Sequence, residues 1–180
     1  DSGVRLMSCQ IFELNPSTGK DDTGNAAHAI IYGADNGAVI SQNSWSWPTG
    51  QIMPEAEKNA IDYVIDFAGC DSEGNQLPGS PRKGGIVIFA AANNQTSSKT
   101  EPSDYERVMA GAAMTPDFQK AYYSNYGSWV DITAPGGDQN YGSAGQLWST
   151  VTRNNYLSMQ GTLMACPHVS GIAALVVSKY

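Results

Sequence analysis

The continuous apolar run over residues 85–91, GIVIFAA, constrains the fold more than any other segment of the chain. Such a run is typical of a strand that is buried on both faces, as strands are in parallel sheets covered by helices. Segments of both kinds flank it and alternate along the chain. The sequence predicts strands over residues 4–12, 38–44, 107–113 and 129–133, and helices over residues 25–36, 54–68 and 163–179. This alternation predicts an α/β sandwich of three layers with a largely parallel sheet.

The predicted helices differ in the side chains that they present. Residues 54–68 form the clearest amphipathic pattern, with Pro54 early, acidic residues in the first turn and a glycine just after the last turn. The segment from about residue 163 to 179 is apolar almost all round, so we expect that helix to be buried. The polar stretch 70–85 is expected to be a surface loop.

The size and charge of the chain limit its function classes. Its 180 residues fit one domain, predicted to span residues 1–180 without internal repeats. The net charge of −7 argues against nucleic acid and against anionic membrane surfaces as partners. No apolar run approaches the roughly 20 residues that a bilayer-spanning helix needs. No signal-peptide pattern stands at the N-terminus.

The sequence gives little sign of thiol or metal chemistry. Cys9, Cys70 and Cys166 show neither metal-ligand spacing nor a disulfide framework, and we interpret them as free structural thiols. Cys70, in the polar loop, is the one candidate for a reactive thiol. No cofactor is expected, and a calcium ion is kept as an alternative to solvated loops because no dense Asp-x-Asp-x-Asp pattern occurs. The acidic loop residues that such an ion would use are Asp21, Asp22, Asp71, Glu73 and Asp138.

Three loops carry unusual residues, at the edge where open parallel sheets form their binding sites. They are residues 43–47 (NSWSW), 90–94 (AAANN) and 161–171 (GTLMACPHVSG). Together, and in this order, they resemble segments of the subtilisin-like serine proteases. The nucleophile motif of that family, Gly-Thr-Ser-Met-Ala-x-Pro-His-Val-x-Gly, agrees with residues 161–171 at every fixed position except one. Residues 123–127 and 130–136 resemble the family's stretch leading to Ala-Pro-Gly, so the resemblance covers nearly the whole chain.

The resemblance implies roles for individual residues. Leu163 stands where the family has its nucleophilic serine. Asn94 falls on the asparagine that helps to bind the oxyanion, and Asn93 falls on the glycine before it. The substrate-binding walls are assigned to Ser44, Trp45, Ser46, Ala91, Ala92 and Asn93. Because Trp45 and Asn93 are bulky, we expect a shallow specificity pocket.

A catalytic triad needs a nucleophile, a base that takes its proton and a carboxylate that orients the base. Leu163 carries no nucleophilic atom. The family's Asp-x-Gly strand end and His-Gly-Thr-His helix are not found, and the triplet at residues 1–3 (DSG) stands before the first strand rather than at its end. His168 is interpreted as a structural histidine of the buried helix, and His28 as a packing residue. We therefore expect a domain without the N-terminal strands and the histidine helix, inactive as written.

Several functions remain open at this point. The first is a piece of a subtilisin-like serine endopeptidase domain with an inactivated nucleophile, either altered from a working protease or a natural pseudoprotease. The second is a module that binds extended peptides by strand addition. The third is one half of a split assembly, whose exposed sheet edges would favour self-association. No Gly-x-Gly-x-x-Gly or P-loop follows a strand, which disfavours nucleotide binding. Peptide or protein substrates and a secreted or extracytoplasmic location are expected from the family resemblance.

Overall fold

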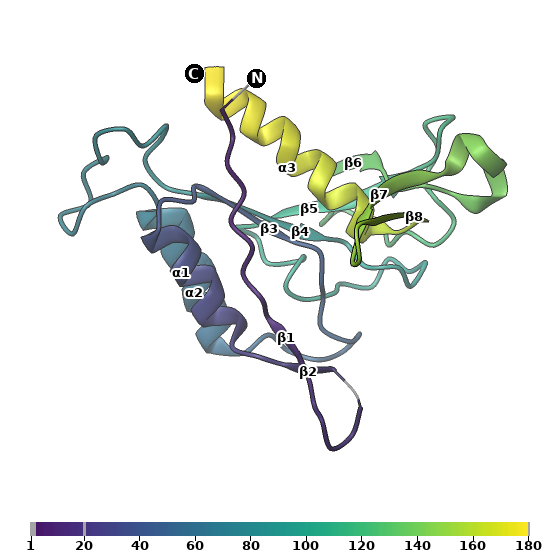
Figure 1. Ribbon diagram of the computed structural model, residues 1–180, viewed down its shortest axis with the longest axis horizontal. Helices are drawn as coiled ribbons and strands as arrows, with labels where there is room; N and C mark the ends of the chain where they lie inside the picture. The colour runs from purple at the N-terminus through teal and green to yellow at the C-terminus, as the bar shows by residue number, and fades with distance from the viewer. Residues whose placement is uncertain (1–2, 20, 180) are drawn as a thin grey trace. The chain divides into compact units, whose positions relative to one another are not determined.

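A computed structural model describes residues 3–19 and 21–179 of the chain (Figure 1). Its strands are β1 (Phe12–Leu14), β2 (Asp21–Thr23), β3 (Ile40–Asn43), β4 (Ile86–Ala90), β5 (Met109–Met114), β6 (Ile132–Pro135), β7 (Leu147–Val151) and β8 (Asn155–Met159). Its helices are α1 (Ala26–Asp35), α2 (Glu55–Phe67), α3 (Thr162–Lys179) and the 3₁₀ helix η1 (Gln139–Gly145).

The chain divides into two compact units. The first consists of residues 1–41, 53–87 and 174–180, and the second of residues 42–52 and 88–173. That the chain is one incomplete domain over residues 1–180 stays a prediction.

Helices α1 and α2 lie side by side in the first unit (Figure 1). The side chain of Asn25 caps α1 by accepting a 2.9 Å hydrogen bond from the backbone N–H of His28. Helix α2 follows Pro54, as its sequence predicts, and its apolar stripe of Ala60, Ile61 and Val64 is buried. Both helices predicted for this part of the chain are therefore confirmed, with their ends shifted by one residue.

Glycine allows the chain to pass close to α2 on its way into β4. A Cβ atom at Gly85 would lie 2.6 Å from both the carbonyl oxygen and a methyl group of Val64. Only a residue without a side chain fits there. The backbone N–H of Gly85 instead donates a 2.8 Å hydrogen bond to that Val64 carbonyl, which fixes the entry to the strand.

The main sheet has the strand order β3-β4-β5-β6, in which β4, β5 and β6 run parallel to one another. The registers place Ile88 beside Met109 and Gly111 beside Ile132. The apolar run of residues 85–91 forms β4, and Ile88, Phe89 and Ala90 have no exposed surface. The predicted α/β class with a parallel sheet is thereby confirmed.

The strand predicted over residues 4–12 is wrong for most of its length. Residues 3–11 form no strand, and only Phe12–Leu14 pairs, antiparallel to β2. Leu6 is 96% exposed. An apolar alternating pattern measures the tendency of a segment to be buried, whereas a strand also needs a neighbour for its backbone groups. No strand of the described part of the chain pairs with residues 3–11.

The prediction that the last helix is buried throughout is also wrong. Thr162, Ala165, Cys166 and Val169 of α3 are buried, whereas Ile172 and Leu175 are 56% and 59% exposed. The helix is long and apolar enough to cross a bilayer, by length and composition only. Helices in the cores of proteins can share both properties, so these two properties do not establish a membrane span. The all-round apolar pattern requires cover on every side, and the described residues cover its first turns only.

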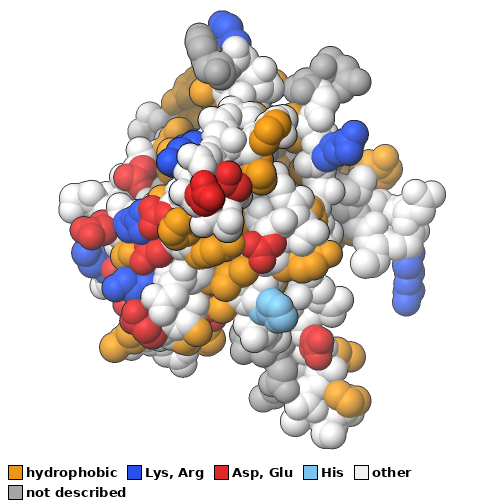
Figure 2. Space-filling view, turned by 90° about the vertical axis from the view of Figure 1, so that its left-hand side faces the viewer, with side chains coloured by type: hydrophobic (Ala, Val, Ile, Leu, Met, Phe, Trp, Pro, Cys, Tyr) orange, Lys and Arg blue, Asp and Glu red, His pale blue; other side chains and the backbone are white. Residues whose placement is uncertain are grey.

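Exposed hydrophobic side chains occur elsewhere as well. Figure 2 shows one face of the molecule, on which such side chains reach the solvent between acidic and basic ones. The hairpin of β7 and β8 adds Trp148 and Tyr156, both largely exposed. The loop of this hairpin has three residues, Thr152 to Asn154, because Val151 pairs with Asn155, and Arg153 and Asn154 turn the chain with positive φ angles of 63° and 55°.

Candidate functional site

Two of the unusual loops meet at the N-terminus of α3, within the second unit. The Ser44 hydroxyl donates a 2.7 Å hydrogen bond to the carbonyl oxygen of Leu163. The backbone N–H and the hydroxyl of Thr162 both donate to Oδ1 of Asn93, at 2.8 and 2.9 Å. Residues far apart in the sequence therefore form one hydrogen-bonded junction around position 163.

Leu163 lies in the first turn of α3 and is half-buried. Its side chain consists of carbon and hydrogen alone, so it can neither attack a carbonyl carbon nor release a proton. The hydrogen bonds at the junction use the carbonyl group of Leu163 and its neighbour Thr162, and none of them uses the side chain at position 163. The position of the expected nucleophile is occupied by a residue that can only pack.

The structure places Asn93, not Asn94, beside Thr162. Because Oδ1 of Asn93 accepts both hydrogen bonds from Thr162, its Nδ2 is left as the donor side of the amide. This Nδ2 lies next to Gly161, since a Cβ at Gly161 would be 3.1 Å away from it. Asn94 is exposed and joins this region through its backbone N–H, which donates to Oδ1 of Asn125 at 2.9 Å. The assignment of Asn94 to the oxyanion stays a prediction, and this geometry favours Asn93.

The turn that carries Asn93 has an unusual backbone. Ala92 has φ 71° and Gln95 has φ 54°, in the left-handed region that glycine adopts most easily. The family resemblance places a glycine in this turn, and the sequence motif alone puts it at Asn93. The left-handed conformation that suits a glycine occurs at Ala92, one residue earlier than the motif alone suggests. The asparagine that follows this glycine-like position is therefore Asn93 rather than Asn94. Sequence alone could not show this shift, because backbone angles are not visible in it.

The candidate substrate wall is rigid at Trp45. Its ring packs edge-on against Phe89 and Trp47, with centroid distances of 5.2 and 6.5 Å. Its indole N–H donates to Oδ1 of Asn43 at 3.3 Å. Ser46 is half-buried, and the side chains of Ala91 and Ala92 are buried, so these alanines shape the wall from below rather than from its surface. The substrate-binding roles of this set stay predictions.

Cys166 follows Leu163 by three residues on α3 and is fully buried. Its sulfur lies 3.6 Å from the Asn43 carbonyl oxygen and 3.8 Å from that of Ile88. Burial raises the pKa of this thiol above its ordinary value, which suppresses the reactive thiolate. Cys9 and Cys70 are also free and are half-exposed. Cys166 is therefore a packing residue rather than a substitute nucleophile.

His168 is not placed at the junction as a base. The ring of His168 is exposed, contrary to the prediction that it lies in a buried helix, and its Nδ1 is 2.9 Å from the Met164 carbonyl oxygen. The reason is that α3 is covered on one side only. His28 lies on the exposed surface of α1, in the other unit.

The calcium alternative stays a prediction. Among the described residues, no group of three or more His, Cys, Asp or Glu side chains could hold a metal ion. The side chains of Asp21 and Asp22 lie outside the described residues. Asp71 accepts hydrogen bonds from the backbone N–H groups of Asn75 and Glu73, which lower the pKa of its carboxyl group. Buried Asp138 accepts from the backbone N–H of Asn140 at the start of η1.

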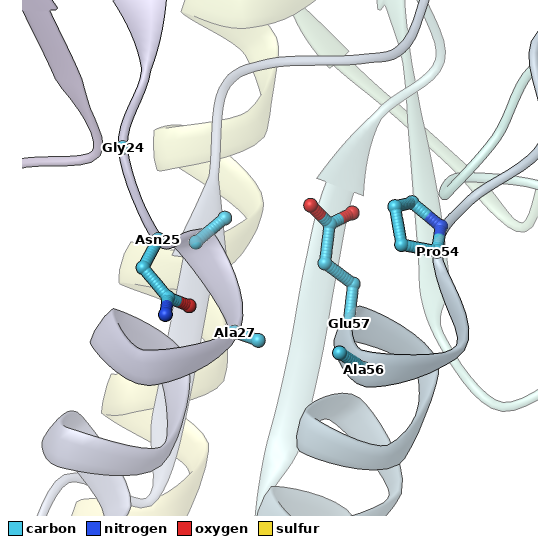
Figure 3. A pocket seen from close by; sticks show the side chains of 7 residues that line it. Gly24, Asn25, Ala27, Pro54, Ala56 and Glu57 are labelled. Atoms are coloured by element: carbon cyan, nitrogen blue, oxygen red, sulfur yellow. The ribbon is translucent and has the colours of Figure 1, made fainter.

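A hollow of about 320 Å³ in the first unit was not indicated by the sequence. It lies at the first turns of α1 and α2, where Figure 3 shows the Glu57 carboxylate reaching up between Asn25 and Pro54. Glu57 is buried although it is acidic. Its place in the first turn of α2 is favourable for a carboxylate, because the N-terminal end of a helix stabilises negative charge.

Comparisons with known proteins show the family of the chain. A sequence model of the subtilase family matches residues 2–180. A thermophilic serine proteinase of Bacillus sp. (strain AK1) is 35% identical over 176 residues, which are 98% of this chain and 36% of that protein. An extracellular basic protease of Dichelobacter nodosus is 42% identical over 100 residues, 53% of this chain and 16% of that protein.

A similar fold occurs in a solved protease structure. A protease from Pseudoalteromonas arctica aligns with a TM-score of 0.65 at 28% identity, over 88% of this chain and 48% of that chain. The chain spans about half or less of the length of these three proteins.

Proposed function

Since the chain belongs to the subtilase family, we propose that it is a piece of a subtilisin-like serine endopeptidase domain that carries the nucleophile position, the oxyanion side and one substrate wall. The observation that carries this proposal is the hydrogen-bonded junction of Ser44, Asn93 and Thr162 around position 163. An amide donor beside the nucleophile position is the arrangement that stabilises negative charge on a tetrahedral intermediate.

With leucine at position 163, the chain binds peptides and does not cleave them. Leucine at position 163 removes the nucleophile, and neither His28 nor His168 takes the part of the base. An oxyanion site and a binding wall without a triad retain at most roughly 10³–10⁴-fold acceleration over water, too little to register for a peptide bond in ordinary assays. The role is that of a pseudoenzyme that holds extended peptides, or of one half of a split assembly.

The partners follow from this role. Peptide or protein segments in extended conformation are the ligands, and the acidic charge disfavours nucleic acid and membrane surfaces. A secreted or extracytoplasmic location is supported by the extracellular protease among the relatives. Self-association through exposed sheet edges is part of this proposal. Exposed apolar side chains of residues 3–11 and of the outer side of α3 add surface that could support it.

Peptide binding is tested by titrating an intact decapeptide into the protein and following tryptophan fluorescence. Mass spectrometry after a day then shows whether the peptide has been cleaved. We expect a saturable signal and an intact peptide. Trp45→Phe should remove most of the signal change, whereas Trp148→Phe, in the hairpin, should keep it. Peptide fragments would refute the predicted inactivity, and a flat titration would refute peptide binding.

A further inference from the structure

We infer that Asn125 is a positioning residue that holds the Asn93 turn in the conformation which aims Asn93 at Thr162. Asn125 is fully buried, and so is its neighbour Ser124. The residue lies outside the site residues that the sequence indicated. The functional meaning assigned to Asn93 rests on the proposed function, whereas the positional claim about Asn125 is tested independently of it.

The contacts of Asn125 lie on both sides of Asn93. Its backbone N–H donates to the Ala92 carbonyl oxygen at 3.1 Å. Its side-chain Oδ1 accepts from the backbone N–H groups of Asn94 and Thr96, at 2.9 and 3.3 Å. The residue before Asn93 and the residue after it are therefore both hydrogen-bonded to one buried asparagine.

The turn needs such support because of its backbone. Ala92 and Gln95 both have left-handed φ angles although neither is glycine. Conformations of this kind persist only where the surrounding structure fixes them. Two further hydrogen bonds, from Gln95 N–H to the Tyr123 carbonyl at 3.0 Å and from Tyr126 N–H to the Thr96 carbonyl at 3.1 Å, join the same two segments.

Asn125 is itself fixed at its other end. Its Nδ2 donates to the Thr100 hydroxyl oxygen at 3.2 Å, and Thr100 is buried. The Ser124 hydroxyl accepts from the backbone N–H of Ala113 in β5 at 3.0 Å and donates to the Asn125 carbonyl oxygen at 3.0 Å. The turn is thus connected through Asn125 and Ser124 to a buried strand of the sheet. A buried amide whose oxygen and nitrogen are both hydrogen-bonded has one favoured orientation, and this orientation fixes the N–H groups of the turn that it binds.

The first test uses the unmodified chain and amide hydrogen exchange by NMR. The amides of Asn94 and Thr96 are expected to exchange about as slowly as that of Ala113 in β5, and about 10- to 100-fold more slowly than that of Asn154 in the hairpin turn. Exchange of Asn94 and Thr96 as fast as that of Asn154 would overturn the inference, and this outcome needs no variant to fold.

The second test compares Asn125→Leu with Thr100→Val, as a matched pair of buried changes. Asn125→Leu removes the acceptor for Asn94 and Thr96, whereas Thr100→Val removes only the partner of Nδ2. Both are expected to lower the melting temperature. Only Asn125→Leu should shift the NMR signals of the Asn93 side-chain amide and of the Thr162 backbone N–H.

Unchanged Asn93 and Thr162 signals in a folded Asn125→Leu variant would show that Asn125 contributes to stability alone. This result would refute the inference that Asn125 positions the Asn93 turn. A failure of the peptide titration leaves these signals unaffected, so the two proposals fail separately.

Discussion

Replacing Ala92 by glycine should leave the stability of the chain nearly unchanged, although glycine usually destabilises a buried position. The reason is the φ angle of 71° at Ala92. An alanine in the left-handed region costs about 1–2 kcal/mol, which glycine does not incur. Against this gain stand the loss of a buried methyl group, about 0.8 kcal/mol, and the larger unfolded-state entropy of glycine, about 0.4–1 kcal/mol. The opposing contributions nearly cancel.

Ala91 offers a matched control, because it is the neighbouring residue and is also buried, with 0% exposure against 5% for Ala92. Its φ angle is not in the left-handed region. Ala91→Gly therefore loses the methyl group and gains unfolded-state entropy without any relief, which should destabilise the fold by about 1.2–1.8 kcal/mol. For a chain of this length that corresponds to a fall in melting temperature of about 2–7 °C.

Urea unfolding followed by circular dichroism measures both variants against the parent chain, and equal m values are required for the comparison. A loss of stability in Ala92→Gly as large as that in Ala91→Gly would refute the reasoning. It would mean that the left-handed residue lies elsewhere in the turn, and the shift of the oxyanion role from Asn94 to Asn93 would lose its main support.

Other predictions concern the site and the pH dependence. Leu163→Ser should give no detectable hydrolysis of a fluorogenic peptide, since a serine without a base stays unactivated; measurable turnover would show that a base is present after all. An aromatic disulfide reagent should titrate Cys9 and Cys70 in the folded chain and Cys166 only after urea is added, because Cys166 is buried with a raised pKa; three fast thiols would contradict that burial. Hydrogen bonds from the Thr115 and Tyr141 hydroxyls lower the pKa of the Asp117 carboxyl group. A folded-state pKa below the unfolded one stabilises the fold above the unfolded pKa, near 4, and this stabilisation is lost as the pH falls through the folded pKa. Asp117→Asn should therefore reduce the difference in melting temperature between pH 7 and pH 3, and an unchanged difference would speak against the shift.

The sequence predicted those elements whose signals are local. The apolar run of β4 and the amphipathic pattern of α2 each lie within one segment, and both elements formed where expected. Residues 4–11 failed as a strand because pairing depends on a neighbour elsewhere in the chain. The hairpin of β7 and β8 was missed because its turn residues Arg153 and Asn154 include no glycine and its strands alternate poorly.

The sequence predicted which segments form the site, but not which of two neighbouring asparagines contributes to it. Position 163 and Ser44 were indicated by motif and were brought together. The choice between Asn93 and Asn94 depended on the φ angle of Ala92, and the role of Asn125 depended on contacts across about thirty residues of sequence. Both are properties of the folded backbone, for which no residue type in the motif gives a signal.

The junction also explains how a chain can keep the nucleophile motif while it lacks the nucleophile. Ser44 holds the carbonyl group of residue 163, and Asn93 holds the N–H and the hydroxyl of residue 162. Any side chain at position 163 leaves these bonds in place, so the architecture of the site does not depend on the residue that performs the chemistry. A leucine there removes the nucleophilic atom without removing the support for the first turn of α3. Loss of the nucleophilic atom and retention of the junction are therefore compatible in one fold, as the proposed peptide-holding role requires.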